Sequence, residues 1–238
     1  MQEWARQVRS RGETIAFVPT MGFLHEGHVS LMRIARQRAD HLVVSIFVNP
    51  LQFGPNEDLD RYPRDEEGDL GKCASAGCDV VYFPTAASMY PPGFQTQVIA
   101  GPLSTVLCGR SRPGHFDGVV TVVLKLFLLV QPQSAVFGGK DYQQLQVIRR
   151  MVRDLSVDVE IVAAPIVREA DGLAMSSRNA FLNPEQRQQA TVLSRALARV
   201  EQLVARGERS GVALREAAVE VIASAPLGQI DYVEVVDA

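Results

Sequence analysis

Two histidines, His25 and His28, are the residues of this chain whose spacing points most directly to chemistry. They follow an apolar run at 14–18 and a glycine-containing turn, and a helical pattern begins at the second histidine. Glycine lets backbone N–H groups approach a ligand, and the N-terminus of the following helix favours negative charge at the same place. The order strand, turn, histidines, helix therefore predicts a site that binds a polyphosphate and stabilises charge developing on it.

The same pair of histidines has two simpler interpretations. It could form part of a zinc site, but zinc needs a third or fourth ligand. The cysteines are scattered at Cys73, Cys78 and Cys108, so the sequence predicts no metal site. A capping or core-edge role is the more common reading of a bare His-x-x-His pair, and here the preceding strand and glycine turn favour the phosphate site.

Four further segments carry polar side chains that could join the same site. The stretch 49–54 has two neutral amides that can hydrogen-bond a hydroxyl or a carboxylate, and 138–141 combines two glycines with a lysine, which suits a phosphate. Two serines and an arginine at 176–178 suit the oxygens of a triphosphate, and the arginines of 109–117 lie on a loop that could close over anions. Taken alone, 49–54 and 176–178 are better explained as an ordinary turn and a polar linker, 138–141 is weak evidence, and 109–117 is equally well explained as a solvated loop. Together they are typical of loops that a parallel sheet gathers at one edge.

The apolar runs that precede these loops predict the scaffold. Strands that are apolar throughout and alternate with helices indicate a parallel sheet covered on both faces. Ligands of such sheets bind beyond the carboxyl ends of the strands, where the strand order reverses, so the first motif is expected there. Strands are expected at 14–18, 41–48, 79–83, 134–138 and 157–163, with a short one near 96–100 in the loop-rich region 84–116, and helices at 3–11, 28–39, 65–76, 117–130 and 141–154.

After the Ser-Ser-Arg segment the pattern changes, which predicts a small second domain. Asn183 followed by Pro184 is typical of a helix start, and this helix is expected to run to about Arg206. A further helix is expected at 211–224, and the alternating residues 230–236 predict a final strand.

Composition excludes several classes of protein. A net charge of −3 without a basic tail argues against a nucleic-acid partner held by charge. The longest apolar stretch, 119–130, is too short to span a membrane and contains Lys125, and the N-terminus lacks the apolar core of a signal peptide. An odd number of cysteines, three, is typical of reduced thiols. We therefore expect a soluble cytoplasmic protein that does not bind membranes.

Five stretches, read together, resemble the pantoate–β-alanine ligase family of the nucleotidyltransferase superfamily. They are PTMGFLHEGH, FVNPLQFG, RPGHFDGVVTVVLKLF, FGGKDYQQL and DGLAMSSRN, and they occur in the order and spacing of that family. The resemblance implies an α/β fold in which a Rossmann-like doubly wound parallel sheet, residues 1–174, binds ATP and pantoate. It also implies a smaller C-terminal α+β lid domain, residues 175–238, which is expected to be truncated because relatives continue further.

The resemblance implies an enzyme, an AMP-forming ligase that makes a C–N bond. In this reaction pantoate and ATP give pantoyl adenylate and pyrophosphate, and β-alanine then gives pantothenate and AMP. The implied cofactor is Mg²⁺ that enters with ATP, and the implied assembly is a homodimer. A site that brings a carboxylate to a polyanion needs positive charge and excluded water, which agrees with the residue types above.

The resemblance also implies roles for individual residues. Those implied to act in catalysis are His25, His28, Lys140 and Arg178, with His28 stabilising the pentavalent phosphorus. The implied ATP-binding residues are Met21, Gly22, His25, His28, Gly138, Gly139, Lys140, Asp141, Val167, Met175, Ser176, Ser177 and Arg178. The residues implied to bind pantoate or β-alanine are Asn49, Gln52, Arg112 and Gln144.

At two positions the chain departs from the family pattern. Cys108 and Gly139 stand where the family usually has glutamate. Losing one charged hydrogen bond costs roughly 1.5–3 kcal/mol, or about tenfold to over a hundredfold in rate, which predicts a weakened enzyme. The departures also keep open an alternative, a non-catalytic or impaired nucleotide-binding paralogue.

Overall fold

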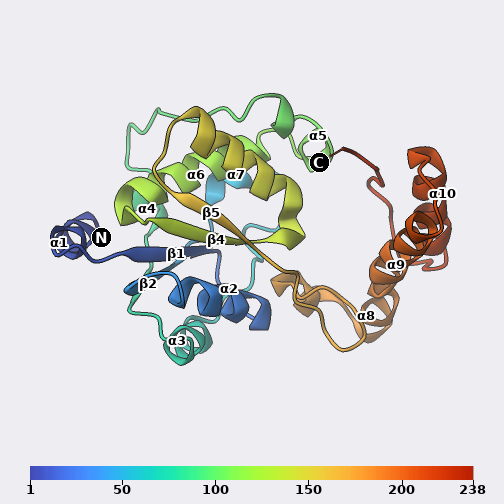
Figure 1. The fold of residues 1–238 in the computed structure, drawn as a ribbon, viewed down its shortest axis with the longest axis horizontal. Coiled ribbons are helices and arrows are strands. Elements are labelled where there is room, and N and C mark those ends of the chain that lie inside the picture. The colour runs from blue at the N-terminus through green and yellow to red at the C-terminus, as the bar shows by residue number, and fades with distance from the viewer. Residues whose placement is uncertain (238) are drawn as a thin grey trace. The chain divides into compact units, whose positions relative to one another are not determined.

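The computed structural model describes residues 1–237 and divides the chain into two compact units (Figure 1). The first unit is Met1–Ile166, and the second begins at Val167. The second unit thus starts earlier in the chain than the lid expected from residue 175. Each unit has its own packing and is described by itself.

A parallel sheet of five strands forms the centre of the first unit. Its order is β3-β2-β1-β4-β5, and each neighbouring pair is parallel. The predicted parallel sheet is therefore confirmed, and its order reverses between β1 and β4. The strands are β1 (Ile15–Thr20), β2 (His41–Ile46), β3 (Val80–Tyr82), β4 (Ser134–Gly138) and β5 (Glu160–Ala164).

Helices cover both faces of this sheet (Figure 1). Successive side chains of a strand point to opposite faces. Accordingly Ile15 and Phe17 of β1 belong to one apolar cluster with α1, α6 and α7, whereas Ala16 and Val18 belong to another with α2 and α3. The helices of the first unit are α1 (Gln2–Ser10), α2 (Glu26–Arg36), α3 (Glu66–Ser75), α4 (Ala86–Met89), α5 (Cys108–Ser111), α6 (His115–Val130) and α7 (Tyr142–Asp154).

The helix α6 is apolar on most of its surface because it lies inside the first unit. Ten of its sixteen residues are buried, and the ring of Phe127 packs edge-on against Phe17 of β1 with centroids 6.3 Å apart. None of the helices formed by residues 1–237 is long and apolar enough to cross a membrane. The apolar composition of α6 thus serves the core.

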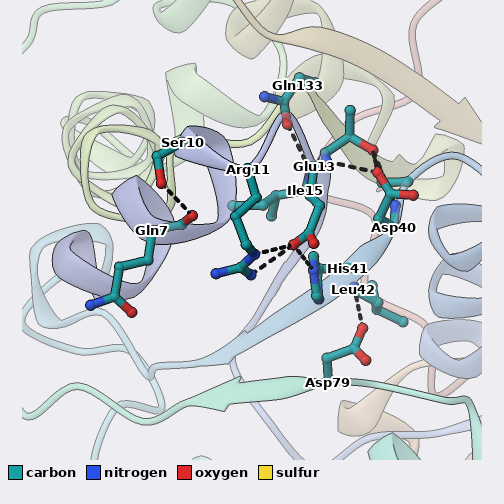
Figure 2. Close-up of polar contacts among 12 residues, drawn as sticks. Gln7, Ser10, Arg11, Glu13, Ile15, Asp40, His41, Leu42, Asp79 and Gln133 are labelled. Atoms are coloured by element: carbon teal, nitrogen blue, oxygen red, sulfur yellow. Dashed lines mark hydrogen bonds and ion pairs between the residues drawn. The ribbon is translucent and has the colours of Figure 1, made fainter.

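At the edge where the strands begin, side chains satisfy the leading backbone N–H groups (Figure 2). Ile15 N–H donates to Oε1 of Gln133 at 2.7 Å, and Leu42 N–H donates to Oδ2 of Asp79 at 2.7 Å. A buried backbone donor without a partner is costly, so these contacts define where the strands start. They leave the opposite edge free to carry the loops of the site.

In residues 167–237 the second unit is built mainly from helices. They are α8 (Pro184–Ala190), α9 (Val192–Ala205) and α10 (Gly211–Ile222). Asn183 accepts from Gln186 N–H at 2.9 Å, which confirms the predicted helix start at Pro184. The helix expected to run without interruption to Arg206 is instead divided at Thr191, whose hydroxyl donates to the Gln188 carbonyl at 2.8 Å.

Two predicted strands are wrong. Near 96–100 no strand forms, because the N–H of Val98 donates to Thr121 and that of Ala100 donates to Asp117, both at 2.9 Å, so α6 side chains replace a neighbouring strand. Residues 230–236 also form no strand, since residues 167–237 contain no other strand to pair with. Alternating apolar residues need a neighbouring ladder before they become a strand.

Candidate active site

The end of β1 and the end of β4 lie side by side at the point where the sheet order reverses. β1 pairs with β2 on one side and with β4 on the other. The helices that follow these strands, α2 and α7, belong to the apolar clusters on opposite faces of the sheet. In doubly wound sheets such a divergence leaves a crevice for ligands beyond the carboxyl ends of the strands. The first motif and the Gly-Gly-Lys segment directly follow these two strands.

The turn after β1 has a backbone that few sequences can adopt. Gly22 has φ +87°, and a Cβ at this position would lie 2.9 Å from Cγ2 of Ile46, so glycine is required. Phe23 follows with φ +50°, which is unusual for a residue with a side chain. Asp69 of α3 accepts the N–H groups of Phe23 and Leu24 at 2.8 and 2.6 Å and thereby holds the turn.

The rings of the two histidines lie close together and tilted at the start of α2. His25 is the N-cap residue, its N–H donates to Nδ1 of His28 at 3.2 Å, and the ring centroids are 4.0 Å apart. Because Nδ1 accepts a hydrogen bond, the proton of neutral His28 lies on Nε2. Burial, together with the nearby His25 and Lys140, lowers the pKa of His28 to about 3. His28 is therefore an uncharged hydrogen-bond donor at neutral pH.

Lys140 supplies the positive charge on the other side of the reversal point. It lies on a short 3-10 turn, Gly139–Asp141, between β4 and α7, and its Nζ is 3.5 Å from Oδ1 of Asp141. The effect of Lys140 on the pKa of His28 means that the two side chains lie within electrostatic reach. The structure thus brings together the histidines and the lysine that the sequence predicted at one site. A Cβ on Gly139 would lie 3.2 Å from the Ala164 carbonyl, which is tight.

The loop after β2 holds Gln52 through a chain of amide contacts. Asn49 is buried, and its Nδ2 donates to Oε1 of Gln52 at 3.0 Å and to the Gly118 carbonyl at 3.1 Å. Oδ1 of Asn49 accepts from the hydroxyl of Tyr90 at 2.7 Å, and burial raises the pKa of Tyr90, so that hydroxyl stays protonated. Nε2 of Gln52 donates to Sδ of Met21 at 3.2 Å. Asn49 therefore acts on the site by fixing Gln52.

Arg112 pairs with Glu57, a partner that the sequence did not predict. Its guanidinium forms a two-pronged ion pair with Glu57, which raises the pKa of Arg112 and lowers that of Glu57. Nη1 of Arg112 also donates to Nε2 of His115 at 3.1 Å, and Nδ1–H of His115 donates to the Gln52 carbonyl at 2.8 Å. This network fixes the loop that carries Gln52.

The other side chains expected at the substrate end lie on α5 and α7. Gln144 is half-buried in the first turn of α7, and in residues 1–237 its side chain makes no hydrogen bond. The N–H of Cys108 donates to Oε1 of Gln143 at 3.1 Å, and its thiol helps to raise the pKa of Arg112. A glutamate at position 108 would therefore add a second acid beside Arg112.

The Ser-Ser-Arg segment belongs to the second unit. Ser176 caps a short 3-10 turn, Ser177–Phe181, by accepting the N–H of Arg178 at 3.3 Å, and Ser177 is buried. The N–H of Met175 donates to the Val167 carbonyl at 3.0 Å. These five predicted ATP-binding residues therefore share one local structure, and their convergence with the histidines stays a prediction.

Three residues that hold loops of the candidate site were not predicted from the sequence. Asp69, Tyr90 and Glu57 each hold a loop of the site from a distant part of the chain. The Asp69 position lies in an acidic helix start, and Tyr90 follows a short helix, so neither carries a local signal. No group of three or more histidine, cysteine or acidic side chains in residues 1–237 could hold a metal ion.

Comparison with known proteins decides the family. The family model described as pantoate-beta-alanine ligase matches residues 1–238. The chain belongs to this family. It is similar to the pantothenate synthetase of Pelobacter propionicus, with 61% identity over 98% of this chain and 82% of that protein. The expected family and the expected enzyme class, a ligase, are confirmed.

Solved structures agree with this assignment. Pantothenate synthetase from Thermus thermophilus has a TM-score of 0.91 at 51% identity, covering 96% of this chain and 83% of that one. The pantoate-beta-alanine ligase from Francisella tularensis has a TM-score of 0.78 at 34% identity, covering 92% of this chain and 83% of that one, and was solved with β,γ-ATP and β-alanine. The predicted α/β fold is thus confirmed by relatives as well as by the sheet itself.

Proposed function

We propose that this chain joins pantoate to β-alanine at the expense of ATP and forms pantothenate. The observation that carries the proposal is the pair His28 and Lys140, a neutral donor and a cation that follow the two strands between which the sheet order reverses. A relative solved with β,γ-ATP and β-alanine supports the same substrates here. Family membership supports pantoate as the third.

The reaction is proposed to proceed in two steps. A carboxylate oxygen of pantoate attacks the α-phosphorus of Mg-ATP and expels pyrophosphate, which gives pantoyl adenylate. The amine of β-alanine then attacks the acyl carbon and expels AMP, with loss of a proton from the nitrogen. Mg²⁺ arrives as part of the nucleotide substrate. Holding two reactants in place can by itself supply roughly 7–11 kcal/mol of the barrier reduction.

In this mechanism the donors of the site act on the phosphates. The Nε2–H of His28 stabilises charge that develops on the α-phosphate without requiring a protonated imidazole, and Lys140 neutralises phosphate oxygens. The amides of Gln52 and Gln144 bind pantoate. ATP contacts are proposed for Met21, Gly22, His25, Gly138, Gly139 and Asp141 in the first unit and Val167, Met175, Ser176, Ser177 and Arg178 in the second, which acts as a lid.

The proposal is tested by two assays on the purified protein. AMP formation is measured with all three substrates and with each omitted, and exchange of labelled pyrophosphate into ATP is measured with pantoate alone. We expect AMP only when pantoate and β-alanine are both present, and exchange that needs pantoate but not β-alanine. Background AMP with intact ATP binding by calorimetry would reject the ligase, and absent exchange with normal AMP formation would reject the adenylate.

The departures at Cys108 and Gly139 favour one rival, an impaired nucleotide-binding protein. A double variant, Cys108→Glu with Gly139→Glu, distinguishes the cases. If the chain is a weakened ligase, the restored acids should raise turnover by about tenfold or more. If the protein binds ATP but forms no AMP, with or without these two changes, it is a nucleotide-binding protein. The proposed homodimer is measured separately, by light scattering.

A further inference from the structure

We propose that Asp69 of α3 is a positioning residue that fixes the two histidines for the reaction on ATP. The expected effect of Asp69 on kinetics rests on the proposed function. Its expected effect on the position of the histidines rests on geometry alone. Asp69 lies 44 residues beyond His25 in the chain and outside every motif that identifies the family. It reaches the site through the backbone of the turn that precedes His25.

Asp69 binds the turn through both oxygens of its side chain. Its side chain is buried, with 2% of its surface exposed, and both of its oxygens accept a backbone N–H, from Phe23 at 2.8 Å and from Leu24 at 2.6 Å. A carboxylate can accept hydrogen bonds with both of its oxygens, and hydrogen bonds to a charged acceptor are the stronger kind. Its place in the first turn of α3 adds the favourable field of the helix N-terminus.

The turn that Asp69 holds is one that would not persist without support. Gly22 and Phe23 are consecutive left-handed residues, with φ +87° and +50°. A residue with a side chain stays in this region only when its surroundings determine it. The carboxylate supplies that determination, because it binds the N–H of Phe23 and the N–H that follows.

The direction of this turn determines where the histidines lie. Leu24 is followed directly by His25, which caps α2 and donates its N–H to Nδ1 of His28. A turn that relaxed to right-handed backbone would move the cap residue and with it the ring of His28. Asp69 therefore acts through the backbone of the turn.

The chemistry of Asp69 is specific to a carboxylate. An asparagine has the same shape but offers one acceptor oxygen, and its NH₂ group would face one of the two backbone donors. Asp69→Asn should therefore keep the packing of α3 while losing one of the two contacts. Asp65 provides a matched control, because it caps the same helix by accepting Gly68 N–H at 3.1 Å and does not touch the turn.

The test compares Asp69→Asn, Asp69→Ala and Asp65→Ala with the unsubstituted protein. Thermal unfolding measures stability, and ¹⁵N NMR of histidine-labelled, substrate-free protein reports the tautomer and titration of His28. For Asp69→Asn we expect the Nδ1 and Nε2 signals to move toward those of a free histidine, and kcat/KM for ATP to fall by about tenfold to a hundredfold. Asp65→Ala should lower Tm and leave both other measurements unchanged.

The outcomes separate this inference from the proposed function. If the unsubstituted protein has no turnover, the NMR comparison still decides whether Asp69 fixes His28. Unchanged histidine signals in Asp69→Asn overturn the inference, whatever the activity. So does a loss of activity that Asp65→Ala reproduces at the same loss of Tm, because the role of Asp69 would then be stability alone. If Asp69→Ala does not fold, the isosteric Asp69→Asn carries the test.

Discussion

His41 lies where the parallel strands begin, here called the amino edge of the sheet, and His28 lies where they end, here called the carboxyl edge. The surroundings of the two histidines differ in almost every respect. At the amino edge, Nε2 of His41 lies 2.8 Å from Oε2 of Glu13, which also binds Arg11 at 2.7 Å (Figure 2). Arg11 and then His41 lower the pKa of Glu13 to about 2. At the carboxyl edge, His28 is buried beside another histidine and near a lysine, and no carboxylate pairs with it in residues 1–237.

The difference separates a histidine that holds the scaffold from the one proposed to act on ATP. The amino-edge groups satisfy one another and the first N–H groups of the strands, so they have little left to offer a ligand. At the carboxyl edge the imidazole of His28 is buried near Lys140, and this environment disfavours its protonated form. A neutral donor and a cation close to one another form an arrangement that suits a polyanion.

The contrast between the two histidines is tested most directly by replacing each of them with alanine. His28→Ala should lower the turnover of ATP to AMP by roughly a hundredfold or more, because it deletes a donor to the charge that develops on phosphorus. His41→Ala should change turnover by no more than about twofold, because surface pairs of this kind contribute little. Steady-state AMP formation at saturating substrates measures both.

A mild effect of His28→Ala would remove its assigned role, and an equal effect of the two changes would dissolve the contrast between the edges. Circular dichroism and Tm of each variant exclude loss of the fold as the cause. His28→Gln keeps an N–H donor and should retain more turnover than His28→Ala.

The dependence of the free energy of unfolding on pH tests the same contrast. The pKa of His28 is lowered from 6.5 to about 3, so between these values the unfolded chain binds a proton that the folded chain does not. The free energy of unfolding then rises with pH and this contribution is complete above about pH 6.5. Between pH 7 and pH 5 we expect a loss of about 2 kcal/mol from His28 alone, measured by urea unfolding.

The control is His28→Gln, which should lose this part of the acid sensitivity, while His41→Gln should keep it. An identical dependence on pH in the unsubstituted protein and His28→Gln would mean that His28 is not held neutral. Other groups titrate in the same window, and the difference between the two variants removes their common contribution.

Local pattern was sufficient to predict the sheet and one side of the site. Apolar strands, a turn with Gly22 and the pair His25 and His28 are neighbours in the sequence, so their juxtaposition follows from local structure. Lys140 could be assigned to the same edge because parallel strands end on one side. Ser176 to Arg178 stay a prediction, since they belong to the second unit.

Long-range partners could not be read from the sequence. Asp69 follows Glu66 and Glu67 in the same helix start, and all three acids look alike until the fold buries one of them against the turn. Alternation misled at 230–236, because a strand depends on its neighbour as much as on its own residues. The residues that hold the site are therefore harder to find than those that form it.

A last pair of substitutions compares one hydrogen bond at each edge. Tyr90→Phe removes the hydroxyl that donates to Asn49 at 2.7 Å, which frees the amide that fixes Gln52. One such neutral bond is worth about 1 kcal/mol, so kcat/KM for pantoate should fall about fivefold. Gln133→Leu at the amino edge removes the acceptor of Ile15 N–H and should lower the urea midpoint without changing kcat/KM. If both variants lost stability and kept kcat/KM, the hydrogen bonds from Tyr90 through Asn49 to Gln52 would serve stability alone. If Gln133→Leu also lowered kcat/KM, the two edges would be coupled through β1. The division between a structural and a functional edge would then fail.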